Sequence, residues 1–277
     1  MSNNAIEYTI KPPKGLVEVN LPELWKYREL LYIFAWRDIK VRYKQTFLGI
    51  AWAIFQPFIT MVIFSVIFGR LASIPSEGVP YPIFVYTGLL LWNYFSSALT
   101  NTSDCLVSNE SIIKKVYFPR LILPLSTAVT PLVDFCFAFL VLIGMMVYFQ
   151  YTPTLLGIVM LPVLLLISLL SASGLGFFLA SVNVKFRDVR HILPFFIQIL
   201  LFVTPVIYPL SIISEKYHWI MSLNPMTGVI SFARATLLGQ GSVDWLQLGF
   251  SAVIGLIIIT LGIAYFRKAE RFFADIL

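Results

Sequence analysis

The run RDIKVRYKQTFLGIAWAIFQP, residues 37–57, places a cationic segment directly before an apolar stretch. No charged residue follows its last lysine until Arg70. Lys and Arg gather on the cytoplasmic side of transmembrane helices, so this pattern indicates a membrane-surface segment that leads into a span. We expect the basic side chains to lie where the chain enters the membrane and to contact lipid headgroups; they are Arg37, Lys40, Arg42 and Lys44.

The composition agrees with a membrane protein. The 277 residues are 58% hydrophobic and 12% charged, with a mean hydropathy of +0.85, whereas soluble domains carry about 25% charged residues. The net charge of +6 does not indicate nucleic-acid binding, because the basic residues lie between apolar stretches and fit orientation in a bilayer better. No cleavable signal peptide is recognisable in the polar first forty residues.

Six stretches are long enough to cross the hydrocarbon core, which takes about 20 helical residues. The sequence therefore predicts an all-α integral membrane protein with six transmembrane helices, near residues 47–68, 81–103, 121–150, 154–184, 192–213 and 245–266. We expect three regions: an N-terminal segment at 1–20, a cytoplasmic interface helix and basic segment at 21–44, and the six-helix transmembrane domain at 45–277.

The basic residues predict the orientation. With the N-terminus in the cytoplasm, seventeen of the twenty Lys and Arg residues lie inside, so both termini are expected there. Between the fifth and sixth spans, Asn224-Pro225 divides two apolar pieces, residues 219–223 and 226–238, each too short to span. We interpret them as external re-entrant or interfacial helices whose backbone is buried by protein.

Two cytoplasmic segments have the pattern of surface helices. In the first, Asn20 is a candidate cap, and Leu24, Tyr27, Leu31 and Phe34 recur at helical spacing, as in an amphipathic interface helix. A solvated basic segment before the membrane explains the same charges equally well. In the second, residues 108–120, Ser108 or Asn109 is a candidate cap, Glu110 and Lys114 are spaced to pair, and Pro119 ends the helix.

The second segment has two open interpretations, a docking surface for a motor subunit or an ordinary connector. The basic loop at residues 183–191 is equally ambiguous.

Within the expected spans, the candidates for lining a transport path are Trp52, Phe55, Tyr86, Tyr94, Asp134 and Phe178. A carboxylate near mid-membrane is costly unless it is neutral or paired, so Asp134 has either a structural hydrogen-bonding role or a pathway role. The aromatic rings are suited to stacking on sugar rings, although helix or lipid packing accounts for any one of them.

Several chemistries lack their motifs. No Gly-Lys dipeptide is present, so the sequence contains no phosphate-binding Walker loop. The two histidines, His191 and His218, fall on opposite sides of the membrane in this topology. We expect no catalytic residues, no metal site and no cofactor in this chain.

The cationic segment, followed by Leu48-Gly49 and Trp52, resembles the signature of the ABC transporter permeases that export O-antigen, capsule and teichoic acid. The other matching motifs are Phe118-Pro119-Arg120-Leu121-Ile122-Leu123-Pro124, Lys185-Phe186-Arg187-Asp188, Pro205-Val206-Ile207-Tyr208-Pro209 and Asn224-Pro225-Met226. The similarity runs from about Trp25 to the C-terminus.

This resemblance implies a permease subunit in the bacterial inner membrane. It implies a homodimer with two ABC ATPase subunits that use ATP and Mg, and an undecaprenyl-diphosphate-linked polysaccharide as substrate. It further implies that the helices Pro22–Phe34 and Asn109–Tyr117 contact the ATPase and that the external helices help close an outer gate. The implied ATPase-contacting residues are Glu23, Lys26, Asn109, Glu110, Ile112, Lys114, Lys115 and Tyr117.

Three other functions compete with this interpretation of the sequence. An ABC permease that exports a drug, haem or another lipid is the nearest. An integral-membrane transferase would need a cluster of acidic or His residues at one membrane face. An ion-coupled carrier would need paired midplane charges or broken helices in both halves.

Overall fold

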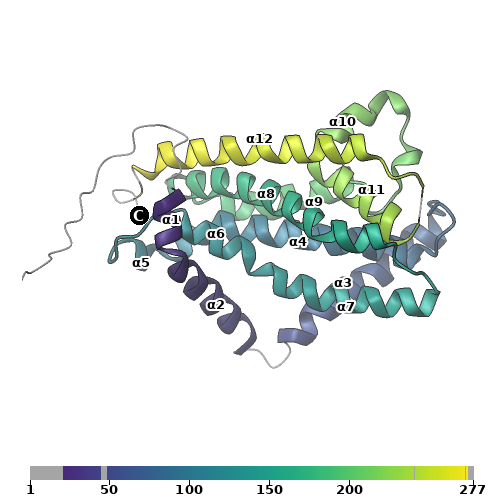
Figure 1. The fold of residues 1–277 in the computed structure, drawn as a ribbon, viewed down its shortest axis with the longest axis horizontal. Helices are drawn as coiled ribbons and strands as arrows, with labels where there is room; N and C mark the ends of the chain where they lie inside the picture. The colour runs from purple at the N-terminus through teal and green to yellow at the C-terminus, as the bar shows by residue number, and fades with distance from the viewer. Residues whose placement is uncertain (1–20, 45–48, 240, 272, 274–277) are drawn as a thin grey trace, which may run out of the picture.

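Every regular element in the described part of the chain is a helix (Figure 1), which confirms the predicted all-α class there. The computed structural model describes residues 21–44, 49–239, 241–271 and 273. The predicted N-terminal segment 1–20, with the Asn20 cap, and the start of the first predicted span lie outside these ranges.

The helices run in the order α1 Leu21–Lys26, α2 Arg28–Lys44, α3 Gly49–Phe64, the π-helix η1 Ser65–Leu71, α4 Tyr81–Ser108, α5 Glu110–Ile113, α6 Ile122–Val129, α7 Pro131–Phe149, α8 Leu155–Lys185, α9 Val189–Val203, the 3-10 turns η2 Leu210–Ile212 and η3 Glu215–Tyr217, α10 His218–Ser222, α11 Pro225–Leu237 and α12 Trp245–Glu270.

Among the residues that the structure describes, four helical segments are long and apolar enough to cross a membrane: residues 51–71, 122–149, 155–185 and 245–270. The second predicted span corresponds to α4, which is long but more polar than these four. The helix expected over the fifth predicted span, 192–213, is shorter than predicted, because α9 covers Val189–Val203 and a non-helical stretch follows. At about 1.5 Å per residue, the 15 residues of α9 extend only about 22 Å.

The long helices lie side by side, with α4 near the middle of the bundle (Figure 1). Most residues of α4 are buried against α6, α7 and α8, and α8 packs in turn along α12. Figure 1 shows α1, α5 and the C-terminal end of α12 at one end of the bundle, called here the α5 end. The opposite end, called the α10 end, carries α10 and the ribbon that leads into it.

The helix predicted at 22–34 is two helices, because the chain turns at Tyr27 and α2 then continues to Lys44. The predicted apolar face does meet an apolar surface. Phe34 is buried, and Leu24, Tyr27 and Leu31 pack on the same cluster, which includes Leu106, Phe118, Phe177 and Phe266.

The two short pieces around Asn224-Pro225 are helices, as predicted from the sequence. The Asn224 side chain accepts a hydrogen bond of 3.0 Å from Met226 N, and Pro225 occupies the first turn of α11. Both features are favoured at helix N-termini. Nearly all of α11 is buried, against α4, α8 and α12.

Candidate functional site

One cavity in the described structure has a volume of about 880 Å³ and lies toward the α5 end, between α2, α4, α6, α8 and α9. Four of the residues that the sequence singled out line it. They are Arg37, Arg42, Asn109 and Ile112. Helices from distant parts of the sequence therefore bring the cationic segment of α2 next to the α4–α5 junction.

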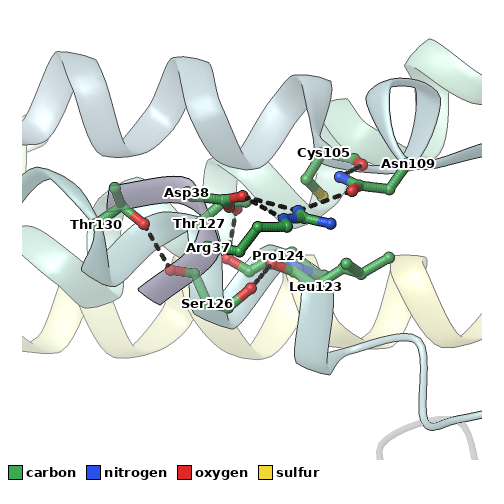
Figure 2. A network of polar contacts seen from close by, with 9 residues as sticks. All are labelled: Arg37, Asp38, Cys105, Asn109, Leu123, Pro124, Ser126, Thr127 and Thr130. Atoms are coloured by element: carbon green, nitrogen blue, oxygen red, sulfur yellow. Dashed lines mark hydrogen bonds and ion pairs between the residues drawn. The ribbon is translucent and has the colours of Figure 1, made fainter. Parts of the chain in front are cut away.

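A polar network joins α2 to that junction (Figure 2). Arg37 donates through Nε and Nη2 to Asp38 Oδ1, at 2.9 and 2.7 Å, and through Nη2 to Asn109 Oδ1 at 2.9 Å. The Asn109 amide donates to the Cys105 carbonyl at 2.8 Å, near the end of α4. The Arg37 guanidinium also lies 5.1 Å from the ring centre of Phe34. These bonds therefore connect α2 directly to the start of α5.

A second ionic contact on the same cavity joins α9 to α4. Arg190 Nε lies 2.5 Å from Asp104 Oδ1, and Ser108 donates to the other oxygen of this carboxylate. Asn183 donates to the Ser103 carbonyl at 3.1 Å. Arg190, in the basic loop at residues 183–191, therefore binds a residue of α4.

The exposed surface beside this network includes α5. The predicted Glu110–Lys114 pair is confirmed, with Nζ and Oε1 2.7 Å apart, and its hydrogen bond lowers the pKa of Glu110. The predicted helix Asn109–Tyr117 is wrong in length, because α5 covers only Glu110–Ile113. Asn109 does not cap it, since its side chain bonds Arg37 and Cys105 instead.

The other residues of the implied ATPase-contacting set extend this surface. Lys115 is exposed, and Tyr117 is 67% exposed. Lys26 is exposed at the end of α1, which lies near α5 (Figure 1). The Glu23 side chain lies outside what the structure describes.

A smaller cavity, of about 130 Å³, lies between α3, α4 and α7, with the end of α2 beside it. It brings together three of the six candidates for lining a transport path: Trp52, Tyr94 and Asp134. Asp134 is paired, because Arg42 Nη2 lies 2.9 Å from its Oδ2 and Tyr43 donates to its Oδ1. Burial and the bond to Asp134 raise the pKa of Tyr43.

The remaining aromatic candidates line neither cavity. Tyr86 is fully buried and donates to the Ala138 carbonyl at 3.0 Å, which ties α4 to α7. Phe55 is exposed beside Trp52, with ring centres 6.0 Å apart. Phe178 is 42% exposed and packs on Tyr265 at 4.8 Å.

The basic residues Lys40 and Lys44 are exposed along α2, and Lys40 lies 5.4 Å from the ring centre of Trp36. They therefore remain accessible to a membrane surface, whereas Arg37 and Arg42 are also bound to carboxylates of this chain.

Sequence reasoning missed Arg234, which it counted only as a charge in an external segment. Arg234 is 4% exposed on α11, and its guanidinium donates to the carbonyls of Phe84, Pro205 and Val206 at 3.2, 2.8 and 2.5 Å. It also stacks 3.6 Å from the ring centre of Phe84. One sequence feature could have identified this residue. Arg234 is a single arginine inside an apolar helix, and a Pro-rich break precedes that helix.

Comparison with known proteins gives a consistent result over most of the chain. The ABC-2 type transporter family matches residues 29–238. The O-antigen export system permease protein of Myxococcus xanthus is 31% identical over 257 residues, 91% of this chain and 97% of that protein. The protein of the same name from Klebsiella pneumoniae is 28% identical, over 90% and 95%.

A second kind of relative is similar as well. The polysialic acid transport protein of Escherichia coli is 24% identical over 243 residues, 85% of this chain and 91% of that protein. The family match spans the residues that line both cavities and all of α11.

Proposed function

This chain belongs to the ABC-2 type transporter family, and from that premise we propose that it is the membrane-spanning permease subunit of an ATP-driven polysaccharide exporter. The observation that carries the proposal is the near full-length similarity to O-antigen export permeases at 28–31% identity. Membership of this family implies that ATP is used by a partner ATPase.

The exported polymer is proposed to be carried on undecaprenyl diphosphate. Two copies of this chain would form the pathway together with two ATPase subunits in the bacterial inner membrane. Support for the dimer comes from the exposed apolar surfaces of α3 and α9, among them Phe58, Ile63, Phe195 and Phe202. Exposed faces of this kind are available to a second copy or to lipid.

Six crossings with both termini in the cytoplasm remain our proposal for the topology. The basic residues of the chain support it, because the termini of α8 and α12 that carry Lys185, Arg267 and Lys268 lie toward the α5 end. Arg234 supports the buried, re-entrant position of α11. Non-helical backbone is tolerated at membrane depth only where protein satisfies it, and this guanidinium satisfies the carbonyls that follow α9.

The ATPase-contacting surface is proposed to comprise α1, α5 and the segment up to Tyr117. The exposed Glu110–Lys114 pair offers both charges to a partner. Directly behind it, the Arg37–Asn109 contact links this surface to α2. A push on α5 during the ATPase cycle would then move the helix that precedes the first span.

Export of a drug, haem or another lipid is the nearest alternative within this family. The names of the relatives favour a polymer, since both kinds refer to bacterial polysaccharide export or transport.

The test is complementation of a bacterial strain whose own O-antigen permease gene is deleted, with this chain expressed together with its proposed partner ATPase. We expect polysaccharide to appear at the cell surface and the ATPase to co-purify with the permease. Intracellular accumulation of the polymer despite normal membrane insertion, with no ATPase bound, would refute the proposal.

A further inference from the structure

We propose that the cavity of about 130 Å³ between α3, α4 and α7 binds one uncharged sugar ring of the transported polymer. This inference rests on the proposed function and gives it a specific subsite. The residues that carry it are Arg42, Trp52, Gln56, Asn93, Tyr94 and Asp134.

Tyr94 supplies the first argument. Its side chain is 2% exposed and lines the cavity, yet its buried hydroxyl has no hydrogen-bond partner among the described residues. Most buried hydroxyls in folded proteins are bonded, so an unpaired hydroxyl on a residue that lines a cavity favours a ligand that supplies the missing bond. A sugar hydroxyl can both donate and accept, which suits a tyrosine hydroxyl.

The charges favour a neutral ligand. Among the described residues that line this cavity, Arg42 and Asp134 are the only charged ones, and they pair with each other at 2.9 Å. Recognition of a phosphate or carboxylate uses charge-assisted bonds from a cation, and here the cation already binds a carboxylate of the chain. Gln56 and Asn93 add amide groups. These groups can donate and accept hydrogen bonds, as the hydroxyl groups of a sugar ring require.

The shape and size favour a single ring. The Trp52 side chain is 55% exposed and provides an aromatic wall, and Phe135 provides a second apolar surface. Aromatic faces suit the apolar C–H face of a sugar while its hydroxyls reach polar groups. The volume is well below the roughly 300–1,000 Å³ of pockets for drug-sized ligands, so the cavity fits one ring at a time.

Binding of free sugars tests the inference directly. The full chain, assembled with its ATPase in nanodiscs, is examined by saturation-transfer NMR with D-glucose, D-galactose, D-mannose, L-rhamnose and N-acetyl-D-glucosamine. We expect transfer to at least one sugar, no competition by inorganic phosphate, and about fivefold weaker binding in Tyr94→Phe, the loss of one hydrogen bond. The absence of transfer to every sugar, competition by phosphate, or unchanged binding in Tyr94→Phe would overturn it.

Tyr86→Phe is the matched control, because Tyr86 is a buried tyrosine on the same helix whose hydroxyl bonds Ala138 and lies outside the cavity lining. It is expected to lower the thermal unfolding temperature and leave sugar binding unchanged. Tyr94→Phe removes an unpaired hydroxyl, so it is expected not to lower that temperature.

The proposed function is judged separately, by complementation with the wild-type chain. Export by the wild type together with unchanged sugar binding in Tyr94→Phe would reject the subsite alone. Failure of the wild type to export would instead reject the function.

Discussion

Arg234 replaces the hydrogen bonds that the backbone loses where α9 ends. The carbonyls of Pro205 and Val206 cannot join a helical ladder, and the Arg234 guanidinium reaches both as well as Phe84 on α4. Gly88 makes room for it, because a Cβ at this position would lie 2.6 Å from Arg234 Nη2. One side chain therefore holds α11, α4 and the end of α9 together.

Arg234→Met is expected to destabilise the protein. The change leaves several buried carbonyls unpaired, and each unsatisfied group costs about 1–3 kcal/mol, so a loss of about 3 kcal/mol or more follows. The measurement is thermal unfolding of the purified protein in detergent. Arg70→Met, which removes an exposed arginine, is the control and should unfold like the wild type. Equal unfolding temperatures for the two variants would show that Arg234 does not hold these elements together.

Only part of the environment of Asp134 could be predicted from the sequence. Its cost inside a span predicted that it would be neutral or paired, and the structure pairs it with Arg42 and Tyr43. The partners could not be identified, because they lie some ninety positions earlier, in a segment that the sequence assigned to the membrane surface. Tyr94 could be singled out as an aromatic in a span, but an unpaired hydroxyl is a property of the folded environment alone.

At the scale of elements, α8 and α12 approach closely because small residues face each other. A Cβ added to Gly262 would lie 2.1 Å from the Gly174 carbonyl oxygen, and one added to Gly255 would lie 2.9 Å from Ser171 Oγ. Small residues permit such close backbone contact between membrane helices, where packing rather than the hydrophobic effect drives association.

Gly262→Val is therefore expected to force α12 away from α8. Overpacking of this kind costs about 1–3 kcal/mol, and the obstacle here is backbone that cannot rotate away. Thermal unfolding and yield of folded protein in detergent measure the effect. Gly249→Val on the same helix is the matched control, because a Cβ there meets nothing within 4 Å. If the two variants unfolded alike, the close contact would not be a determinant of stability.

The one-turn helix α5 is the proposed site of motor docking. Glu110→Lys is expected to reduce export strongly while membrane insertion remains normal, since the partly exposed side chain pairs only with Lys114 on the surface of α5. Surface polysaccharide and ATPase co-purification are the two measurements. The control is Lys216→Glu at the α10 end, because this change adds no charge to a span. Normal export by Glu110→Lys would remove the docking assignment.

Element types were predictable from the sequence, but several boundaries were not. Capping and hydrophobic spacing placed α10 and α11 correctly, since Asn224-Pro225 is a local signal. The helix Asn109–Tyr117 that the family resemblance implied is shorter, since α5 ends at Ile113, and the bond from Arg37 to Asn109 could not be foreseen from the sequence. The end of α9 was also not predictable from composition. The helix ends at Val203, before Pro205, although the sequence remains apolar beyond that point.

For the whole molecule, the number of crossings depends on the segment that follows α9. The helix covers about 22 Å, short of the roughly 30 Å of a hydrocarbon core. The non-helical residues 204–209 can add up to about 3.3 Å each, which is enough to complete a crossing. Within this stretch, the carbonyls of Pro205 and Val206 accept hydrogen bonds from Arg234, and that of Ile207 accepts one from Tyr81, as a position inside the membrane requires.

Fusion reporters at three positions decide between six crossings and fewer. We expect an alkaline phosphatase fusion to be active when it follows Tyr151 or Ser214, and a green fluorescent protein fusion to fluoresce at the C-terminus. If α9 failed to cross, the position after Ser214 would lie in the cytoplasm and α12 would carry the C-terminus outside. Active phosphatase at the C-terminus would therefore refute the six-crossing topology, and with it the cytoplasmic position of Arg267, Lys268 and the rest of the α5 end.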